Sequence, residues 1–366
     1  MISRFRSFRR WRASTSSRVS RLFRWRSPFS RQCAYASTIA LSTVFGALSD
    51  SAVAAMLGRS ALPTMTARGY APRLSAGVIL AGASLAPIIP PSLLAIIVGS
   101  LADVSIAGLL IAGVGPGLLI AGLTGLWVAI SVARDPALAP PEVETAPEGS
   151  SARAPLRMAP FLVIIASVMG LIVLGIATPG ESAATGVLGA LAVAAIYRRL
   201  TLAMALDALA SATAISAMIL VIVAASKLFS QLLAFTGATR ALVAWSAGLG
   251  LDPMAMLALM MLVPFVVCMF VDQIAFLLMA VPLYGPLVGA VGFDPVWFWT
   301  LFLVNLTLGS VTPPFGYTLF ALAGAAPGLG TGGVFRASLP VIGLFVGAIV
   351  LMALWPPLVT WLPGLM

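Results

Sequence analysis

Two pairs of adjacent prolines lie inside long uncharged stretches of this 366-residue chain, Pro90-Pro91 and Pro313-Pro314. A proline inside a helix lacks the amide donor and clashes with a preceding carbonyl, so each pair predicts a break in a helix. Broken backbone at membrane depth is tolerated where it is buried in protein or lines a cavity. The carbonyls freed there can bind Na⁺, a hard cation that prefers oxygen, although a structural kink is the alternative.

Isolated polar side chains in apolar surroundings form a second group of candidates. Asp272 is the one charged residue between positions 253 and 293. A carboxylate at bilayer depth is costly and indicates function, unless it lies at a water-exposed turn. Ser49, Asp50 and Ser51 form a similar polar group, although serines in membrane helices often only bond the helix backbone. Three polar residues before the second proline pair can line a pathway or hold helices together: Asn305, Thr307 and Ser310.

The composition places these residues in a membrane protein. Hydrophobic residues make up 60% of the chain and charged residues only 9%, whereas soluble domains carry about 25% charged residues. The chain has no histidine and no nucleophile with a plausible base, which argues against an enzyme. Its two cysteines are far apart in sequence, so neither a disulfide framework nor a cysteine metal cluster is expected.

Seven uncharged stretches are candidate membrane crossings, since a helix of about 20 residues spans the hydrocarbon. They are Leu74–Ala102, Val104–Ala133, Met158–Gly180, Ser182–Tyr197, Ala208–Ser226 continuing to Thr239, Pro295–Phe335 and Ala337–Met366. Two further stretches, 32–65 and 253–293, are predicted to be re-entrant hairpins that turn near mid-membrane. Lys227, the only lysine, lies within a crossing, where it either extends toward the interface or pairs with a carboxylate at a hairpin tip.

Arginines in short loops predict the orientation, because cytoplasmic loops are rich in them. If the N-terminus is cytoplasmic, the loops on the opposite side of the membrane contain one arginine, Arg240, and the C-terminus lies outside the cytoplasm. The cytoplasmic loops then hold Arg68, Arg73, Arg134, Arg153, Arg157, Arg198, Arg199 and Arg336.

An internal repeat relates the two ends of the chain. The two proline pairs are separated by 223 residues, and so are the sequences Gly-Tyr-Ala-Pro from Gly69 and Gly-Phe-Asp-Pro from Gly292. The same offset places residues 49–51 on residues 272–274. Each unit therefore has a hairpin, a loop, a proline-broken helix and a helix, in opposite membrane orientations. Inverted-topology repeats of this kind are typical of secondary transporters.

These features divide the chain into five parts. They are an Arg-rich arm (1–31), a first repeat (32–133), a cytoplasmic linker (134–157), scaffold helices (158–252) and a second repeat (253–366). The arm holds ten arginines and no acid. It can be a tail that binds nucleic acid or anionic lipid, a transit-type peptide, or a misassigned start. The first repeat has far fewer preceding residues than the second, so we expect further helices to precede it in a complete carrier.

Several motifs resemble the large membrane subunit of tripartite ATP-independent periplasmic (TRAP) transporters. The resemblance runs from about residue 36 to the end of the chain. The motifs are FGALS from Phe45, RGY from Arg68, IPPS from Ile89, AGVGPG from Ala112, TPGESAA from Thr178, MFVD from Met269 and GSVTPPFG from Gly309. Each motif is short, but their order and spacing together are specific.

The resemblance implies an elevator-type carrier in the bacterial inner membrane that imports organic acids, such as C4-dicarboxylates or sugar acids, together with Na⁺. It implies two partners, a small four-helix membrane subunit and a periplasmic binding protein. One Na⁺ would lie between Ser49–Ser51 and the Ile89-Pro90 break, and another between Met269–Asp272 and Thr312-Pro313. The substrate would lie between the two tips and breaks, at Ser49, Asp50, Ser51, Pro90, Pro91, Thr312, Pro313 and Pro314.

The chain departs from the family pattern at both hairpin tips. Asp50 and Cys268 each stand where the family usually has glycine, and Asp50 adds a negative charge beside an anionic substrate. Two alternatives to the TRAP subunit remain open. One is a stand-alone carrier of the same superfamily that works without a binding protein. The other is a non-transporting remnant of a truncated gene.

Overall fold

The computed structural model describes residues 50–139, 154–326 and 328–365, and every regular element among them is a helix. The all-helical fold predicted from the sequence is therefore confirmed. Ser49, the Arg-rich arm and most of the 134–157 linker lie outside the described residues.

The first unit begins with α3 (Asp50–Ala67) and α4 (Pro72–Leu85), joined by a turn at Gly69. The chain then leaves the helix through Pro90-Pro91, a cis peptide bond, before α5 (Leu93–Ala102) begins. Ser92 starts α5 as an N-cap, since its hydroxyl accepts the Ala95 amide at 3.2 Å. α6 (Ile106–Ala112) and α7 (Val114–Arg134) complete the unit, and the 3₁₀ helix η1 (Pro136–Leu138) follows.

In the second unit, α12 (Pro253–Cys268) and α13 (Gln273–Val291) are joined by residues 269–272, where the sequence predicted the tip of a hairpin. That this pair of helices turns back within the membrane stays a prediction. α14 (Pro295–Ser310) runs into the second cis bond, Pro313-Pro314, and α15 (Tyr317–Ala325) follows the break. α16 (Gly330–Leu354) and the short α17 (Pro357–Thr360) and η2 (Pro363–Leu365) end the chain.

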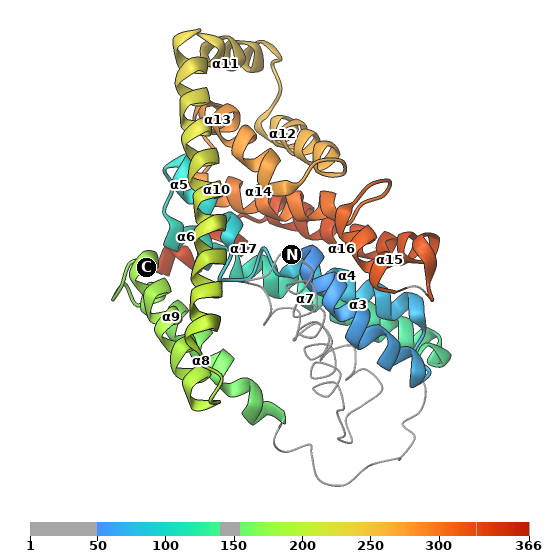
Figure 1. Cartoon of the computed structure of the whole chain (residues 1–366). Coiled ribbons are helices and arrows are strands. Elements are labelled where there is room, and N and C mark those ends of the chain that lie inside the picture. Colours follow the sequence, from blue (N-terminus) through green and yellow to red (C-terminus); the bar gives the residue numbers. More distant parts are fainter. Residues whose placement is uncertain (1–49, 140–153, 327, 366) are drawn as a thin grey trace, which may run out of the picture.

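The two units pack reciprocally against each other. α3 of the first unit lies against α15 of the second, and α13 of the second lies against α5 of the first. α4 likewise packs on α16, and α14 packs on both α6 and α16. Figure 1 shows the blue α3 and α4 beside the red α15 and α16, although they lie at opposite ends of the sequence. The order α13, α14, break, α15 resembles the order α3, α4, break, α5, while the internal repeat and its inverted membrane orientation stay predictions.

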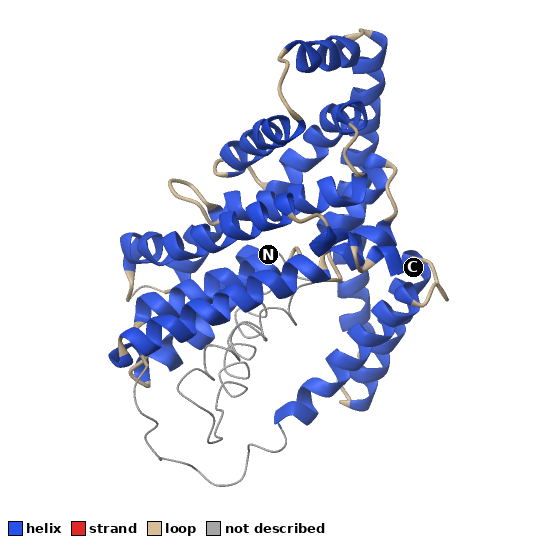
Figure 2. Cartoon of the chain, turned by 180° about the vertical axis from the view of Figure 1, so that it is seen from behind, coloured by secondary structure: helices blue, strands red, loops and turns tan. Residues whose placement is uncertain are grey.

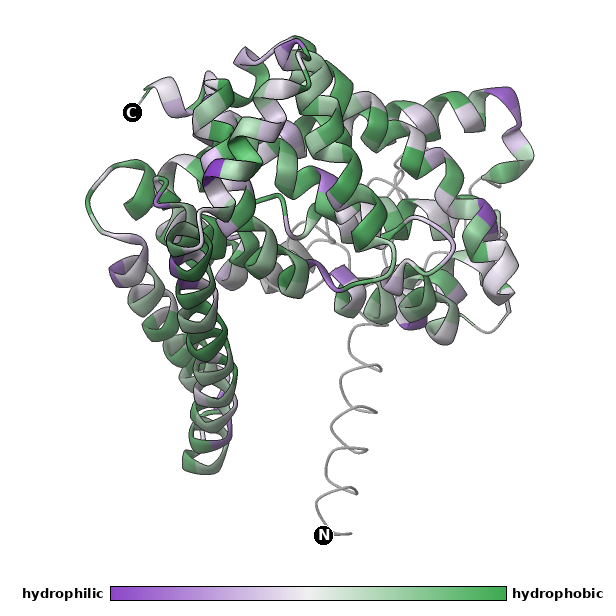
Figure 3. Cartoon of the chain, turned by 90° about the horizontal axis from the view of Figure 1, so that it is seen from above, coloured by the Kyte–Doolittle hydropathy of each residue, from purple (hydrophilic) through white to green (hydrophobic). Residues whose placement is uncertain are grey.

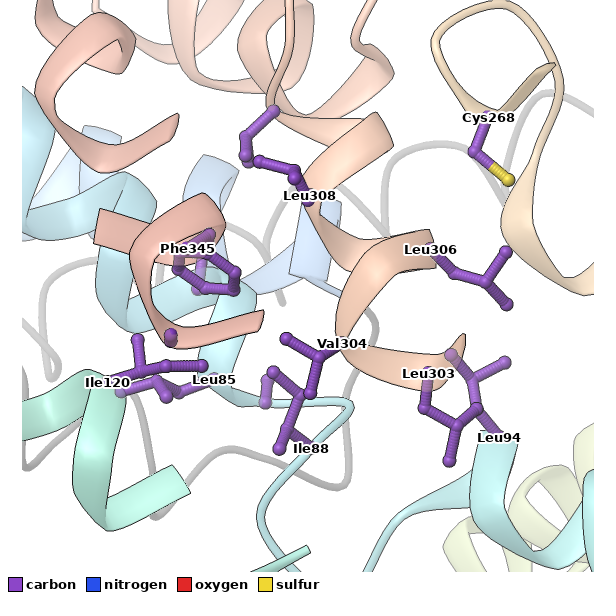
Figure 4. Packing of buried hydrophobic residues seen from close by; sticks show 14 of the residues in the cluster. Leu85, Ile88, Leu94, Ile120, Cys268, Leu303, Val304, Leu306, Leu308 and Phe345 are labelled. Carbon is purple, nitrogen blue, oxygen red and sulfur yellow. The ribbon is translucent and has the colours of Figure 1, made fainter. Parts of the chain in front are cut away.

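The core of the molecule forms around α14, whose residues from Trp297 to Ser310 are all buried. Figure 4 shows Leu303, Val304 and Leu308 of this helix among side chains from both units. They include Leu85 and Ile88, which lead into the first proline break, and Phe345 of α16. Because apolar burial is the main stabilising term, this packing joins the first unit to the second around α14.

The helices between the two units are much less buried. They are α8 (Ala154–Val173), α9 (Pro179–Ile196), α10 (Leu202–Phe235) and α11 (Ala238–Gly248). α10 is a long apolar helix, and it contains an apolar stretch of 18 residues in which no residue is buried within the chain. It runs along one side of the packed units, where it contacts α13 (Figures 1 and 2). Such an uncovered apolar surface is suited to lipid or to another membrane subunit.

Five helical segments are long and apolar enough to cross a membrane: 106–134, 179–196, 202–235, 273–291 and 330–354. Figure 3 shows hydrophobic residues along most helices, with hydrophilic residues gathered at a few turns. The predicted C-terminal boundaries were wrong: we expected crossings at Pro295–Phe335 and Ala337–Met366, but α16 runs from Gly330 to Leu354. The charge-based division placed the boundary at Arg336, whereas the Pro and Gly residues of the sequence PGLGTGG from position 327 mark where the helix begins. The predicted division into five parts stays a prediction.

Candidate functional site

Asp50 is the centre of a buried polar cluster that joins both units. It is the first residue of α3 and is only 1% exposed. Its carboxylate accepts hydrogen bonds from Ser310 Oγ at 2.7 Å and Thr318 Oγ1 at 3.0 Å. The Tyr317 hydroxyl lies 3.3 Å from both carboxylate oxygens. The Ser51 amide also donates to Oδ1, at 2.9 Å.

The second hairpin contributes Gln273 to the same cluster. Its Nε2 donates to Asp50 Oδ2 at 2.8 Å and also to the Tyr317 hydroxyl. Gln273 is separated from Asp50 by 223 residues, the offset of the internal repeat. The positions that the offset aligns therefore meet in space, and side chains from α13, α14 and α15 converge on one carboxylate oxygen of Asp50 in α3.

The charge of Asp50 has no basic partner among the residues that the structure describes. Its side-chain partners are three hydroxyls and an amide, all neutral. Among the residues that the structure describes, the ion pair joins Lys227 Nζ to Asp103 Oδ2 at 3.4 Å and does not involve Asp50. Burying a carboxylate costs free energy unless it is paired or well hydrogen-bonded. The cluster is thus suited to attract a cation.

Lys227 does not pair with a tip carboxylate, which was one of the two alternatives. Its Nζ contacts the exposed Asp103 and donates to the Leu101 carbonyl at 3.2 Å, at the end of α5. Lys227 therefore ties α10 to the first unit, away from Asp50.

The residues of the first proline break make hydrogen bonds and packing contacts with nearby residues of the same unit. The buried Ser92 hydroxyl donates to the Pro87 carbonyl, so this freed carbonyl already has a partner. Gly113 lies against the break from the junction of α6 and α7. A Cβ at Gly113 would be 2.4 Å from the Ile88 carbonyl oxygen, which is closer than real contacts allow. Ile89, Pro90 and Pro91, which the sequence placed at the site, form this break. None of them is a hydrogen-bond partner of the Asp50 side chain.

The second proline break borders the Asp50 cluster. Ser310 ends α14 before the break, and Tyr317 and Thr318 begin α15 after it. Thr312 is buried between them, with its hydroxyl donating to the Leu308 carbonyl at 2.6 Å. Pro313 and Pro314 form the break itself and are partly or fully exposed.

Asp272 lies at an exposed turn, apart from this cluster. Its carboxylate accepts the amides of Ile274 at 2.9 Å and Ala275 at 3.2 Å, which makes it the N-cap of α13. Asp272 is exposed within this chain, and both its role as an ion ligand and the alternative of a water-exposed turn stay predictions. Met269 begins the same turn and is partly exposed.

The structure therefore rearranges the predicted site. The sequence paired the first tip with the first break, whereas Asp50 of the first tip contacts the second break and the second hairpin. Ser310 was a candidate in the sequence, but Tyr317 and Thr318 were not. The only signal for Gln273 was the repeat offset, which aligned it with Asp50. Side chains that follow a break carry no periodic pattern that would have pointed to the other two.

Comparison with known proteins supports a transporter family. The chain matches the family model described as "Tripartite ATP-independent periplasmic transporter, DctM component" over residues 28–358. It is 33% identical over 332 residues to the ectoine/5-hydroxyectoine TRAP transporter large permease protein UehC of Ruegeria pomeroyi, covering 90% of this chain and 77% of that protein.

A second relative and a solved structure agree with this match. The C4-dicarboxylate TRAP transporter large permease protein DctM of Pseudomonas aeruginosa is 31% identical over 204 residues, covering 56% of this chain and 48% of that protein. The fold resembles the crystal structure of the Alcanivorax borkumensis YdaH transporter, with a TM-score of 0.66 at 17% identity. The similarity covers 95% of this chain and 82% of that one, and at this identity it bears on the fold alone.

Proposed function

Because the chain belongs to the DctM family of tripartite ATP-independent periplasmic transporters, it is a multi-pass membrane permease subunit, and we propose that it imports small organic acids by Na⁺-coupled secondary transport. The observation that supports this most is the meeting of the two repeat units at Asp50 and Gln273. Sites at the interface of repeats, next to broken helices, are typical of secondary transporters.

The substrate proposal rests on what the relatives are named for. The Ruegeria relative is named for ectoine and 5-hydroxyectoine, and the Pseudomonas relative for C4-dicarboxylates. All of these compounds carry a carboxylate. We therefore propose a carboxylate-bearing organic solute, of the C4-dicarboxylate or sugar-acid type, that occupies the region between the two proline breaks.

The proposed partners are a small four-helix membrane subunit and a periplasmic binding protein that delivers the substrate. The uncovered apolar surface of α10 supports the membrane partner, because Leu220, Val221 and Leu228 are each at least 66% exposed within this chain. A surface of this kind stays in lipid or packs against another helix in the membrane.

Uptake into proteoliposomes tests the proposal. The chain is reconstituted with the small membrane subunit, the binding protein is added outside, and radiolabelled C4-dicarboxylates and sugar acids are supplied. We expect uptake with an inward Na⁺ gradient and no requirement for ATP. Equal uptake in Na⁺-free buffer under a proton gradient would show proton coupling instead. Equal uptake without the binding protein would favour the stand-alone carrier.

A further inference from the structure

We propose that Ser226 and Lys227 of α10 form a latch, which holds α10 against both units in the arrangement seen here and opens when the carrier changes conformation. The inference rests on the proposed function only for the premise that the chain alternates between conformations. Figure 1 shows α10 running along the side of the units next to α13. The two side chains bind α13 and the end of α5, and not the Asp50 cluster.

The Ser226 contact meets a carbonyl group that a proline leaves without its usual partner. α13 contains Pro282, which has no amide to donate to the carbonyl four residues earlier, at Leu278. The Ser226 hydroxyl donates to this carbonyl at 2.5 Å in buried surroundings. α10 thus supplies a hydrogen bond that α13 cannot make within itself. Because a buried carbonyl needs a partner, separating α10 from α13 would leave the Leu278 oxygen unsatisfied.

The Lys227 contact meets the same kind of group at the end of α5. The last carbonyls of a helix have no amide partner within it, and α5 ends at Ala102. Lys227 Nζ donates to the Leu101 carbonyl at 3.2 Å and lies 3.4 Å from the carboxylate of Asp103, the C-cap residue. Asp103 is a negative charge at the negative end of a helix, which a cation compensates. Lys227 therefore satisfies a carbonyl and a carboxylate together.

The surroundings of Lys227 make the latch costly to open. It is the only lysine of the chain, and it lies in a helix that is long and apolar enough to cross a membrane. A cation at membrane depth is costly unless it has a partner. The Ser226 hydroxyl can turn to a carbonyl of its own helix after separation, but Lys227 and the Leu278 carbonyl would lose their partners. The two contacts therefore favour the present position of α10.

The position of the latch connects it to conformational change. Ser226 and Lys227 are adjacent in the sequence and bind different units, α13 in the second and α5 in the first. Secondary carriers alternate by moving one bundle of helices against another. A shift of α10 by one helical turn, about 5.4 Å, would break both contacts. The latch would thus stabilise one conformation of the carrier relative to the other.

Distances between spin labels in the full chain, measured in nanodiscs, test the inference without any transport assay. In a background without Cys33 and Cys268, labels are attached to cysteines at Leu220 of α10 and Leu93 of α5, which are both exposed. Lys227→Met combined with Ser226→Ala removes both contacts and keeps most of the lysine stem. We expect the population of a second distance to rise at least about tenfold, because a hydrogen bond to a charged group shifts an equilibrium by about that factor.

Two variants are the controls for this measurement. Lys227→Arg keeps the charge and the donors, and Leu228→Ala changes an exposed neighbour on the same helix. Both should keep the distance distribution of the unmodified sequence. An unchanged distribution in the double variant, with or without a lower Tm, would show that these contacts do not set the position of α10 and would overturn the inference.

Reversible cross-linking tests whether the latch opens during transport. In the same background, cysteines replace Lys227 and Asp103 and are joined by a bifunctional thiosulfonate about as long as a lysine side chain. We expect uptake to stop as cross-linking proceeds and to return when a reductant cleaves the link. Undiminished uptake by the cross-linked protein would contradict the inference. A lack of uptake before cross-linking would count against the proposed function instead, and the distance measurement would still decide whether the latch exists.

Discussion

Asp50 and Asp272 show how similar carboxylates acquire different roles through their surroundings. Both lie at the start of a helix, but Asp50 is 1% exposed and receives bonds from three other helices, whereas Asp272 is exposed and bonds only to its own helix. A buried carboxylate must be compensated by specific partners, while water compensates an exposed one. The residue type alone therefore did not indicate which of the two forms a site.

Substitutions at Asp272 test its role as a cap. Asparagine is about as good an N-cap as aspartate, so Asp272→Asn should change neither stability nor Na⁺ dependence noticeably. Asp272→Ala loses both amide contacts and should destabilise α13 by about 1 kcal/mol. Thermal unfolding with and without Na⁺ measures both effects. A weaker Na⁺ dependence in Asp272→Asn would restore Asp272 as an ion ligand.

At the level of elements, the proline breaks depend on small residues in the helices next to them. Gly113, between α6 and α7, faces the Ile88 carbonyl so closely that no side chain fits. Gly309 of α14 is similarly close to Cys268, because a Cβ there would lie 2.6 Å from the cysteine Cβ. Each contact brings a hairpin or a break against its neighbour at backbone distance, as small residues do in membrane helix packing.

Gly113→Ala tests whether this close contact holds the first break in place. Its methyl group would meet backbone rather than a flexible side chain, so we expect a destabilisation of about 1–3 kcal/mol and reduced uptake. Gly122→Ala in α7 is the matched control, since a Cβ there meets nothing within 4 Å. It should be neutral or slightly stabilising. Equal Tm values for the two variants would show that the junction is not tightly constrained.

The whole molecule consists of two units that pack reciprocally, together with peripheral helices that expose apolar surface. α10 joins the two groups: its Ser226 hydroxyl donates to the Leu278 carbonyl of α13 at 2.5 Å, and Lys227 binds the end of α5. Because Ser226 and Lys227 are adjacent, these two contacts join α10 to both units at the same point along the helix. Most of the remainder of α10 is exposed within the chain, apart from partly buried residues such as Ile222 and Val223, which is the arrangement expected of a helix that meets lipid or a partner on its other faces.

The predicted orientation is tested in the loops before α10 and after α11. In a background without Cys33 and Cys268, single cysteines are placed at Leu200 and Leu251, both exposed and outside the helices. The arginine distribution predicts that Leu200 faces the cytoplasm and Leu251 the periplasm. A membrane-impermeant maleimide should therefore label Leu251→Cys in intact cells and Leu200→Cys only after permeabilisation. The reverse pattern would invert the topology.

The sequence by itself determined the membrane class, the helical fold and the two breaks, and its repeated spacing predicted the equivalence of Asp50 with Gln273. These follow from local properties: apolar run length, the missing amide of proline and a repeated spacing. Only the tertiary structure decided that Asp50 meets Ser310, Tyr317 and Thr318 of the other unit rather than the break in its own. The unit against which a hairpin packs depends on how much apolar surface the facing helices bury together, here α3 against α15 and α13 against α5. That buried area is a property of both helices and cannot be determined from the sequence of one segment.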